Sequence, residues 1–424
     1  MKKILLFGAG KSATCLIDYL ARESAIQGWE LMLADANLEA ARSKIAGITH
    51  ARAIELNADE GAARKNLVGQ ADLVISLLPP ALHYLIAKDC IASGKNLLTA
   101  SYVDDQFAGL KKDIEENKLL FICELGLDPG IDHMSAMEII HRIHSSGGKI
   151  NSFRSHTGGL VAPESDNNPW HYKISWNPRN VVLAGKAGAT YKLNGQVVKV
   201  SYPQLFESCQ QVNIAGLGEL TYYPNRDSLS YIPTYGLEEA STFLRTTLRY
   251  PVFCENWKWI VKAGLADDKL PIKVAGLKYR EWSKSIRPWV NKSNEEIFSY
   301  LGFFSEELVP SHCIYSADIL QGLLESKLAM QPGDKDMIVM LHEFDYELNG
   351  RKEKLSSLLT VKGEDHIRTA MAKTVGLPLG IAAKLILQDR IKLTGLHIPI
   401  LPAIYLPVLM ELRSHGILFS EEIS

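Results

Sequence analysis

Over the first 125 residues, short apolar runs alternate with segments in which apolar residues recur at helical spacing. The apolar runs lie at 3–7, 29–34, 72–78, 96–99 and 119–124. Helical spacing is found at 11–25, 38–45, 81–93 and 104–117. Short strands that are apolar on both faces and alternate with helices are typical of a parallel sheet covered on both sides. The pattern predicts an N-terminal, doubly wound α/β domain.

After residue 130 the pattern changes. Residues 131–144 have helical spacing, residues 149–232 are strand-like, and residues 236–330 are mostly helical. Asn194-Gly195 and Asn349-Gly350 each lie between alternating segments and predict two-residue hairpin turns. A further helical segment spans 364–388.

We therefore expect three domains that do not follow one another in a simple row. Residues 1–130 form the first, and the tail at about 393–424 returns to it. Residues 131–234 and 335–392 form a mixed α/β domain for a substrate, and 235–334 is a mainly α-helical insertion into it.

Composition and charge narrow the class of protein. Hydrophobic residues make up 46% of the 424 residues and charged residues 22%, with a net charge of −2. A non-specific nucleic-acid binder would carry a clear basic excess, so we expect no nucleic-acid partner. No apolar stretch approaches the roughly 18–20 residues that span a bilayer, so we also expect no membrane partner. The six cysteines form no Cys-x-x-Cys pair, which is typical of buried thiols in a reducing cytosol and predicts a cytoplasmic protein.

The first strand is followed by a glycine-rich segment that fits G-x-G-x-x-A. Gly8, Gly10, Lys11, Ser12 and Ala13 occupy it, between a strand and a helix. Glycines at these positions let the backbone approach a pyrophosphate, whose charge the helix N-terminus meets. We therefore interpret the first domain as a Rossmann-type domain for a nicotinamide dinucleotide.

Asp35 ends the second strand, where an acid can bind both hydroxyls of an adenosine ribose. The same acid would repel a 2′-phosphate, so NAD is favoured, with NADP as the alternative. Leu77, before Pro79-Pro80 at the end of the 72–78 strand, is expected beside the cofactor.

The densest motif is GLDPGIDH at 126–133, which follows the last strand of the first domain. Asp128 precedes a proline, which favours an extended backbone, and Asp132 can cap the next helix. A rigid turn with a helix cap is one interpretation, and a catalytic loop at the domain crossover is the other.

The sequence resembles the saccharopine dehydrogenase family of the L-glutamate-forming type, also called saccharopine reductase. The resembling segments cover nearly the whole chain. They are GAGKSA (8–13), DLVISLLP (72–79), TASY (99–102), ELGLDPGIDH (124–133), GGLVAPESDNNP (158–169), YKISW (172–176), YPNRDS (223–228), TLRYP (247–251) and GEDH (363–366). GLDPGIDH, YPNRDS and TLRYP together are specific, whereas many dehydrogenases share the glycine fingerprint.

The resemblance implies oxidation of saccharopine to L-glutamate and 2-aminoadipate 6-semialdehyde, or the reverse reaction, in lysine metabolism. It also implies three kinds of domain, which agrees with the pattern. A homodimer is expected because it is common for such dehydrogenases. Saccharopine carries three carboxylates and a secondary amine, so the site needs arginines and a positioned acid or base.

The family's site positions fall on specific residues of this chain. Tyr102 and Asp128 match the acid–base positions. Substrate positions match Ser101, Tyr102, Asp128, Arg226, Thr247, Leu248 and Arg249. Cofactor positions match Thr99, Leu127, Pro129 and Ser175, in addition to the glycine loop, Asp35 and Leu77.

Thr157 departs from the family pattern, because members often have cysteine just before the Gly-Gly-Leu segment. A thiol can exchange a proton near neutral pH and a threonine hydroxyl cannot, so we expect an effect on rate or pH optimum. The departure bears on the rate more than on the reaction class, and a related substrate is the alternative interpretation.

Several other functions are weighed against this one. His133, His141 and His144 lack metal-ligand spacing, so no metal is expected. Tyr250, Trp257 and Trp259 are interpreted as core or dimer contacts. A carboxynorspermidine-type dehydrogenase is the first alternative, although its substrate has fewer carboxylates than the two arginine motifs suggest. A non-catalytic NAD-binding regulatory protein is the second, and the presence of Asp128 and Tyr102 argues against it.

Overall fold

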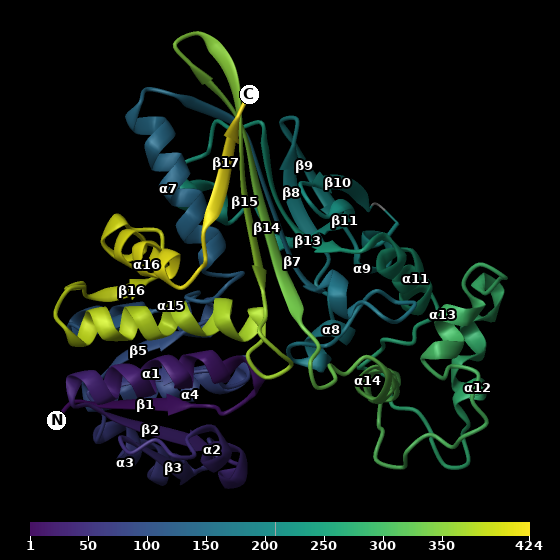
Figure 1. Cartoon of the computed structure of the whole chain (residues 1–424), viewed down its shortest axis with the longest axis horizontal. Coiled ribbons are helices and arrows are strands. Elements are labelled where there is room, and N and C mark those ends of the chain that lie inside the picture. The colour runs from purple at the N-terminus through teal and green to yellow at the C-terminus, as the bar shows by residue number, and fades with distance from the viewer. Residues whose placement is uncertain (208) are drawn as a thin grey trace. The chain divides into compact units, whose positions relative to one another are not determined.

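The computed structural model describes residues 1–207 and 209–424, which form two compact units (Figure 1). Unit 1 comprises Met1–Ser146 and Ile367–Leu418. Unit 2 comprises Gly147–His366 and Phe419–Ser424. Each unit is therefore assembled from two separate stretches of the chain.

Unit 1 contains a seven-stranded parallel sheet, counted over the described residues, in the order β16-β6-β5-β4-β1-β2-β3. The elements of this unit are β1 (Lys3–Phe7), η1 (Lys11–Ala13), α1 (Thr14–Gln27), β2 (Glu30–Asp35), α2 (Leu38–Lys44), β3 (Ala51–Glu55), α3 (Gly61–Gly69), β4 (Leu73–Ser76), α4 (Pro80–Ser93), β5 (Asn96–Thr99), α5 (Asp105–Ala108), α6 (Lys111–Glu116), β6 (Leu120–Ile122), α7 (Ile131–Ser145), α15 (Ala370–Leu387), β16 (Gly395–His397) and α16 (Pro402–Ser414). This confirms the predicted doubly wound sheet.

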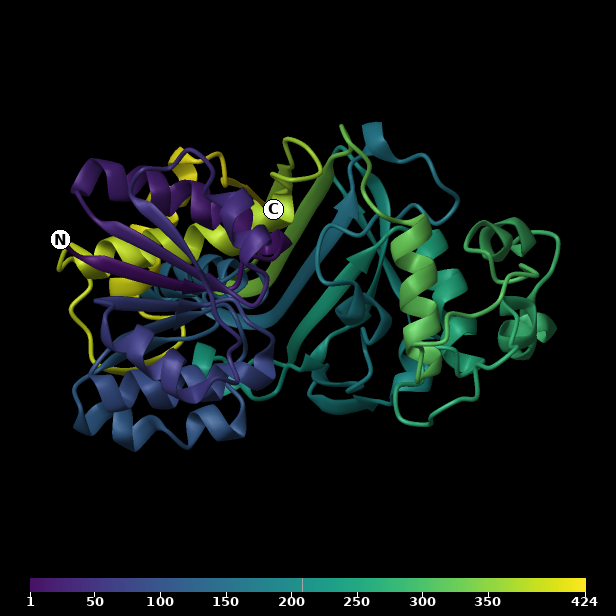
Figure 2. The ribbon, with the colours of Figure 1, turned by 90° about the horizontal axis from the view of Figure 1, so that it is seen from below.

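Helices cover both faces of this sheet, as Figure 2 shows. Leu5 and Phe7 of β1 pack into one buried cluster together with Leu67 of α3 and Ile86 of α4. Alternate residues of a strand point to opposite faces, so the intervening Ile4 and Leu6, both 0% exposed, face the other helical layer. Burial on both faces explains why the central strands are almost wholly apolar.

Two expectations about unit 1 need correction. Strand β3 was not predicted, because its five residues ARAIE are only partly buried and give no apolar run. The expected single helix at 104–117 is two shorter helices, α5 and α6.

The expected domain boundaries also differ from the observed units. Helices α7 and α15 were expected in the substrate domain, but both belong to unit 1. The packing of α15 gives the reason: a Cβ added at Gly376 would lie 2.8 Å from the backbone nitrogen of Leu16, and one added at Gly380 would lie 2.5 Å from Tyr19 Cδ1. These two glycines let α15 lie directly against α1.

Helix α15 is also the one described helix that is long and apolar enough to cross a membrane, with a mean hydropathy of 1.5. The expectation that no apolar segment reaches this length therefore needs correction. In the structure 78% of the segment is buried against unit 1, as in the core helix of a globular protein.

Unit 2 contains a ten-stranded mixed sheet among the residues that the structure describes, with the main order β10-β11-β13-β7-β14-β15-β17. Its elements are β7 (Lys149–Val161), η2 (Pro163–Ser165), α8 (Pro178–Val182), β8 (Ala189–Leu193), β9 (Gln196–Val200), α9 (Tyr202–Leu205), β10 (Gln210–Ile214), β11 (Gly218–Pro224), β12 (Arg226–Asp227), α10 (Tyr231–Tyr235), β13 (Thr242–Arg249), α11 (Pro251–Lys262), α12 (Tyr279–Trp282), η3 (Ser283–Trp289), α13 (Glu295–Tyr300), α14 (Ser316–Lys327), β14 (Asp336–Leu348), β15 (Arg351–Lys362) and β17 (Phe419–Ile423). The long strands β7, β14 and β15 lie side by side (Figure 1).

Both predicted hairpins are present in unit 2. Asn194-Gly195 joins β8 to β9, and Asn349-Gly350 joins β14 to β15. All four residues have positive φ, between 49° and 81°, as a type I′ turn requires. Asparagine and glycine tolerate this left-handed conformation better than other residues do.

The helical segment of unit 2 shares a buried core with the strand-rich part. Trp170, Tyr223, Trp257, Phe298 and Leu320 belong to one cluster. Trp257 is fully buried, so its interpretation as a core residue is confirmed. The insertion at 235–334 therefore does not separate from unit 2 as a compact unit of its own.

Candidate active site

The glycine loop of unit 1 has the geometry of a dinucleotide-binding turn. Gly8 has φ +101°, and a Cβ there would lie 3.0 Å from the carbonyl oxygen of Leu77, so glycine is required for the turn itself. A Cβ on Gly10 would meet nothing within 4 Å, so the structure leaves open space beside the backbone there. The loop leads directly into η1 and then α1. These features fit a pyrophosphate held beside the start of a helix.

Asp35, at the end of β2, is hydrogen-bonded to the backbone of the glycine loop. Its Oδ2 accepts a hydrogen bond from the Ala9 N–H at 2.7 Å, and its Oδ1 accepts one from the Asn37 N–H at 2.8 Å. Each carboxylate oxygen can accept a further hydrogen bond, so Asp35 can still bind ribose hydroxyls. The residues that follow, Ala36 and Asn37, are neutral.

The carboxyl ends of β4 and β5 supply the next group of predicted residues. Leu77 is half-buried and its N–H donates to the Phe7 carbonyl at 2.9 Å. Thr99 ends β5 and is 1% exposed. Ser101 lies two residues further on, and the Ser101 N–H donates to Thr99 Oγ1 at 3.2 Å. The carboxyl edge of a parallel sheet is where such folds bind their ligands.

The segment from Gly126 to Asp132 is a rigid turn. The Gly126 N–H donates to the Pro129 carbonyl at 2.9 Å, and the Ile131 N–H donates to the Gly126 carbonyl at 2.9 Å. A Cβ on Gly130 would lie 2.1 Å from that carbonyl oxygen, so only glycine fits. Asp132 is 2% exposed, and its Oδ1 accepts a hydrogen bond from the Gly130 N–H at 2.6 Å. Asp132 therefore fixes the turn at the start of α7.

The turn brings the two predicted acid–base residues together. The Tyr102 hydroxyl donates a hydrogen bond to Asp128 Oδ1 at 3.0 Å, and both side chains are only partly buried. A phenol and a carboxylate at this distance can share and transfer a proton. The sequence places these residues 26 positions apart, and the structure makes them neighbours.

A buried contact between His133 and Glu124 supports this arrangement. His133 Nε2 lies 2.8 Å from Glu124 Oε2, and the two side chains are 0% and 4% exposed. Glu124 Oε1 also accepts a hydrogen bond from the Val103 N–H at 3.1 Å, directly after Tyr102. Glu124 thus ties the segment that carries Tyr102 to the helix that follows Asp128. His133 was weighed as a metal ligand against a surface or capping histidine, and Glu124 was not singled out, because the contact between them is not visible in the sequence.

In unit 2, Arg249 is a buried cation without an acidic partner among the described residues. The residue is 4% exposed, and its Nη1 donates to the Leu248 carbonyl at 2.8 Å. Its guanidinium lies 5.5 Å from the ring centroids of both Tyr172 and Phe253. Nε has no hydrogen-bond partner within residues 1–207 and 209–424. An uncompensated buried guanidinium with an unused donor is suited to an anionic ligand.

The other predicted substrate residues of unit 2 lie on neighbouring strands. Thr247 pairs in register with Thr157 of β7, so these two residues and Arg249 share one face of the sheet. Arg226 is exposed and has a positive φ of 49° in β12, beside β8. Leu248 has its side chain on the opposite face, fully buried in an apolar cluster. Any contact from Leu248 to a ligand bound by Arg249 must therefore come from its backbone.

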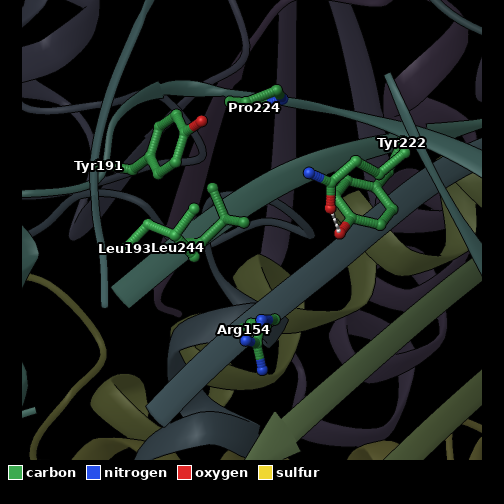
Figure 3. A pocket seen from close by; sticks show the side chains of 7 residues that line it. Arg154, Tyr191, Leu193, Tyr222, Pro224 and Leu244 are labelled. Carbon is green, nitrogen blue, oxygen red and sulfur yellow. Dashed lines mark hydrogen bonds between the residues drawn. The ribbon is translucent and has the colours of Figure 1, made fainter. Parts of the chain in front are cut away.

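A hollow lies on that opposite face of the unit 2 sheet (Figure 3). It is lined by Arg154, Tyr191, Leu193, Gln210, Tyr222, Pro224 and Leu244. The Tyr222 hydroxyl donates to Gln210 Oε1 at 2.6 Å across one side of it. Tyr222 pairs with Leu248, so strand alternation points Arg249 away from this hollow.

The remaining predicted positions divide between the units. Leu127 and Pro129 are buried in the turn of unit 1, whereas Ser175 is a buried residue of unit 2. No cluster of three or more metal-ligating side chains is found in the part of the chain that the structure describes.

Comparisons with protein families match both units. The model described as "Saccharopine dehydrogenase NADP binding domain" matches residues 4–122. The model described as "Saccharopine dehydrogenase C-terminal domain" matches residues 126–417. The second match alone covers more than half of the chain.

Individual relatives agree with these matches. The chain is 32% identical over 450 residues to a saccharopine dehydrogenase [NADP(+), L-glutamate-forming] of Pyricularia oryzae, with 100% of this chain and 99% of that protein covered. It is 34% identical to an alpha-aminoadipic semialdehyde synthase of Arabidopsis thaliana, covering 99% of this chain but only 44% of that longer protein. The chain thus spans less than half the length of that relative.

A solved structure shows the same fold over the full chain. The apo saccharopine dehydrogenase (L-Glu forming) from Saccharomyces cerevisiae superimposes with a TM-score of 0.89 at 32% sequence identity. The comparison covers 100% of both chains.

Proposed function

The chain belongs to the saccharopine dehydrogenase family, and on this premise we propose that it oxidises saccharopine to L-glutamate and 2-aminoadipate 6-semialdehyde in lysine metabolism. The observation that carries the substrate assignment is Arg249, a buried guanidinium that lacks an acidic partner among the described residues. A substrate with three carboxylates supplies the missing anion. Arg226, which is exposed on β12, is proposed to bind a second carboxylate.

The proton transfers are assigned to Asp128 and Tyr102. The secondary amine must lose its proton before hydride leaves the adjacent carbon, and Asp128 is proposed to accept that proton. The Tyr102 hydroxyl, bonded to Asp128 at 3.0 Å, orients the carboxylate and can relay the proton. Water then adds to the imine, and the resulting carbinolamine collapses to aldehyde and amine, with the same pair moving the protons. A nicotinamide dinucleotide held by the glycine loop and Asp35 would supply the hydride acceptor.

We propose NAD as the preferred form of the cofactor, although the matched family model and the fungal relatives are named for NADP. Asp35 places a carboxylate where the 2′-phosphate of NADP would lie. The neighbouring Ala36 and Asn37 offer no cation to bind that phosphate. The repulsion is thus not compensated locally.

Turnover assays with the purified chain test the proposed reaction. Saccharopine with NAD or NADP is expected to give a rise in the absorbance of reduced cofactor, faster with NAD. Carboxynorspermidine is the comparison substrate and is expected to react more slowly, because it offers fewer carboxylates to the two arginines. Saturable NAD binding without turnover of either substrate would contradict the proposal.

A further inference from the structure

His83 of α4 connects the ends of two neighbouring strands of unit 1. Its Nδ1 lies 2.8 Å from Ser76 Oγ, at the end of β4, and its Nε2 lies 2.7 Å from Ser101 Oγ, just after β5. Thr99 Oγ1 is a weaker neighbour of the same Nε2, at 3.4 Å. Both ring nitrogens are therefore occupied by hydroxyl groups.

The imidazole is neutral at physiological pH. His83 is 4% exposed, and burial lowers the pKa of its imidazole to about 4, with the charge of Asp104 opposing this change in part. A neutral imidazole donates a hydrogen bond through one nitrogen and accepts one through the other. One of the two serine hydroxyls must therefore donate its proton to His83, and the other must accept a proton from it.

The chemistry of the ligand selects between these two tautomers. An anionic substrate offers only acceptor oxygens at its carboxylates, so a hydroxyl that binds it must donate. Ser101 can donate outward only if its oxygen accepts from the Nε2–H of His83. Nδ1 then accepts from the Ser76 hydroxyl, which is fully buried and bonds to His83 alone among the described side chains. The opposite tautomer would direct the Ser101 proton into the imidazole.

We propose that His83 is a positioning residue, which holds the Ser101 hydroxyl as a hydrogen-bond donor toward a carboxylate of the substrate. This inference rests on the proposed function, because it takes Ser101 to contact saccharopine. It adds a residue outside the motifs that carry the family resemblance. It also gives Ser76 a role, as the buried donor that fixes the tautomer.

A double-variant cycle separates this role from a purely structural one. His83→Phe removes both hydrogen bonds, and we expect it to raise the KM for saccharopine about tenfold, in line with one lost hydrogen bond to a charged group. Ser101→Ala is expected to raise it by a similar factor. In a protein that already carries Ser101→Ala, His83→Phe should raise the KM for saccharopine by less than about a further twofold, because His83 acts on the substrate only through Ser101. The KM for the cofactor should stay within about twofold of the unchanged protein throughout.

Two conservative variants, His83→Gln and His83→Asn, provide a matched comparison. They also test the proposal if His83→Phe does not fold. His83→Gln can place an amide donor near the Nε2 position and should recover most of the saccharopine KM. His83→Asn places its amide near Nδ1 and should not. If the two increases in the KM for saccharopine multiply in the double variant, or if the KM for the cofactor rises in parallel, the role of His83 is overturned while the proposed function still stands. Absence of turnover by the unchanged protein would overturn the proposed function, and the inference with it.

Discussion

In the proposed function, the choice between the two cofactors depends on Asp35. Its two carboxylate oxygens accept backbone N–H groups of Ala9 and Asn37, so the side chain is fixed at the end of β2. A fixed negative charge there favours two ribose hydroxyls over a 2′-phosphate. The charge, rather than the shape of the loop, is the discriminating feature.

Replacing Asp35 by asparagine should therefore weaken the preference for NAD over NADP. The asparagine side chain still offers an oxygen that can accept a hydrogen bond from the backbone of the glycine loop. We expect Asp35→Asn to raise kcat/KM with NADP relative to NAD by about tenfold, or ~1.4 kcal/mol. Glu39→Gln is the matched control, since it removes the same charge from the exposed first turn of α2 and should leave the ratio unchanged. An unchanged ratio in Asp35→Asn, measured by steady-state kinetics with both cofactors, would exclude Asp35 as the determinant.

Arg249 combines a cost in stability with a proposed role in substrate binding. Its buried guanidinium has no acidic partner among the described residues, which lowers the stability of the free protein, and a carboxylate of the proposed substrate would compensate its charge. The prediction is that Arg249→Met raises the KM for saccharopine about 100-fold and leaves the melting temperature unchanged or higher.

Arg249→Lys is the companion variant. Lysine keeps the positive charge but cannot form the bidentate hydrogen bonds of a guanidinium. We therefore expect a KM for saccharopine between those of the unchanged protein and Arg249→Met. Kinetics and differential scanning calorimetry of the two variants provide the measurement. A melting temperature that falls sharply in Arg249→Met would show instead that the arginine is mainly a structural residue.

At the scale of elements, the contact between α15 and α1 explains how the C-terminal part of the chain returns to unit 1. Gly376 approaches the backbone of α1 directly, because a Cβ there would lie 2.8 Å from the Leu16 backbone nitrogen. We predict that Gly376→Ala destabilises the protein by about 1–3 kcal/mol, because the helices must move apart. Gly322→Ala, in the exposed part of α14 where a Cβ meets nothing within 4 Å, should stabilise it by up to about 1 kcal/mol.

Thermal denaturation of the two variants measures this difference directly. A shift of about 2–4 °C per kcal/mol is expected for units of this size. Equal melting temperatures for the two alanine variants would contradict the prediction, because α1 and α15 would then move apart without loss of stability.

The same elements show what the sequence could predict. Alternation of apolar strands and helices predicted β1, β2, β4, β5 and β6 of the unit 1 sheet, and the two Asn-Gly pairs predicted their hairpins. Helix α15 is apolar on nearly every side, so its pattern gave no face that would assign it to one unit. Strand β3 was missed because half-exposed residues leave no apolar run.

The site was predicted less completely than the fold. Gly8 and Gly130 could be recognised, since each is fixed by a backbone requirement. Leu248 was grouped with Arg249 although neighbouring strand residues face opposite ways, a distinction that alternation in β13 could have supplied. His83 and Glu124 were missed because their roles come from contacts that form only when separate loops meet.

On the scale of the whole molecule, the predicted site residues are divided between the two units. Unit 1 carries the glycine loop, Asp35 and the Tyr102–Asp128 pair, and unit 2 carries Arg226 and Arg249. The net charge of −2 over 424 residues does not reveal these arginines, because a few cations at a site scarcely alter the total. A family match across both units therefore says more about function than overall composition does.

The most direct test of the central claim is the product of the reaction. Purified protein is incubated with saccharopine and NAD, and reduced cofactor and L-glutamate are quantified in the same samples. The account predicts equal amounts of the two, together with 2-aminoadipate 6-semialdehyde. Formation of lysine and 2-oxoglutarate instead, or no reduced cofactor with either NAD or NADP, would contradict it.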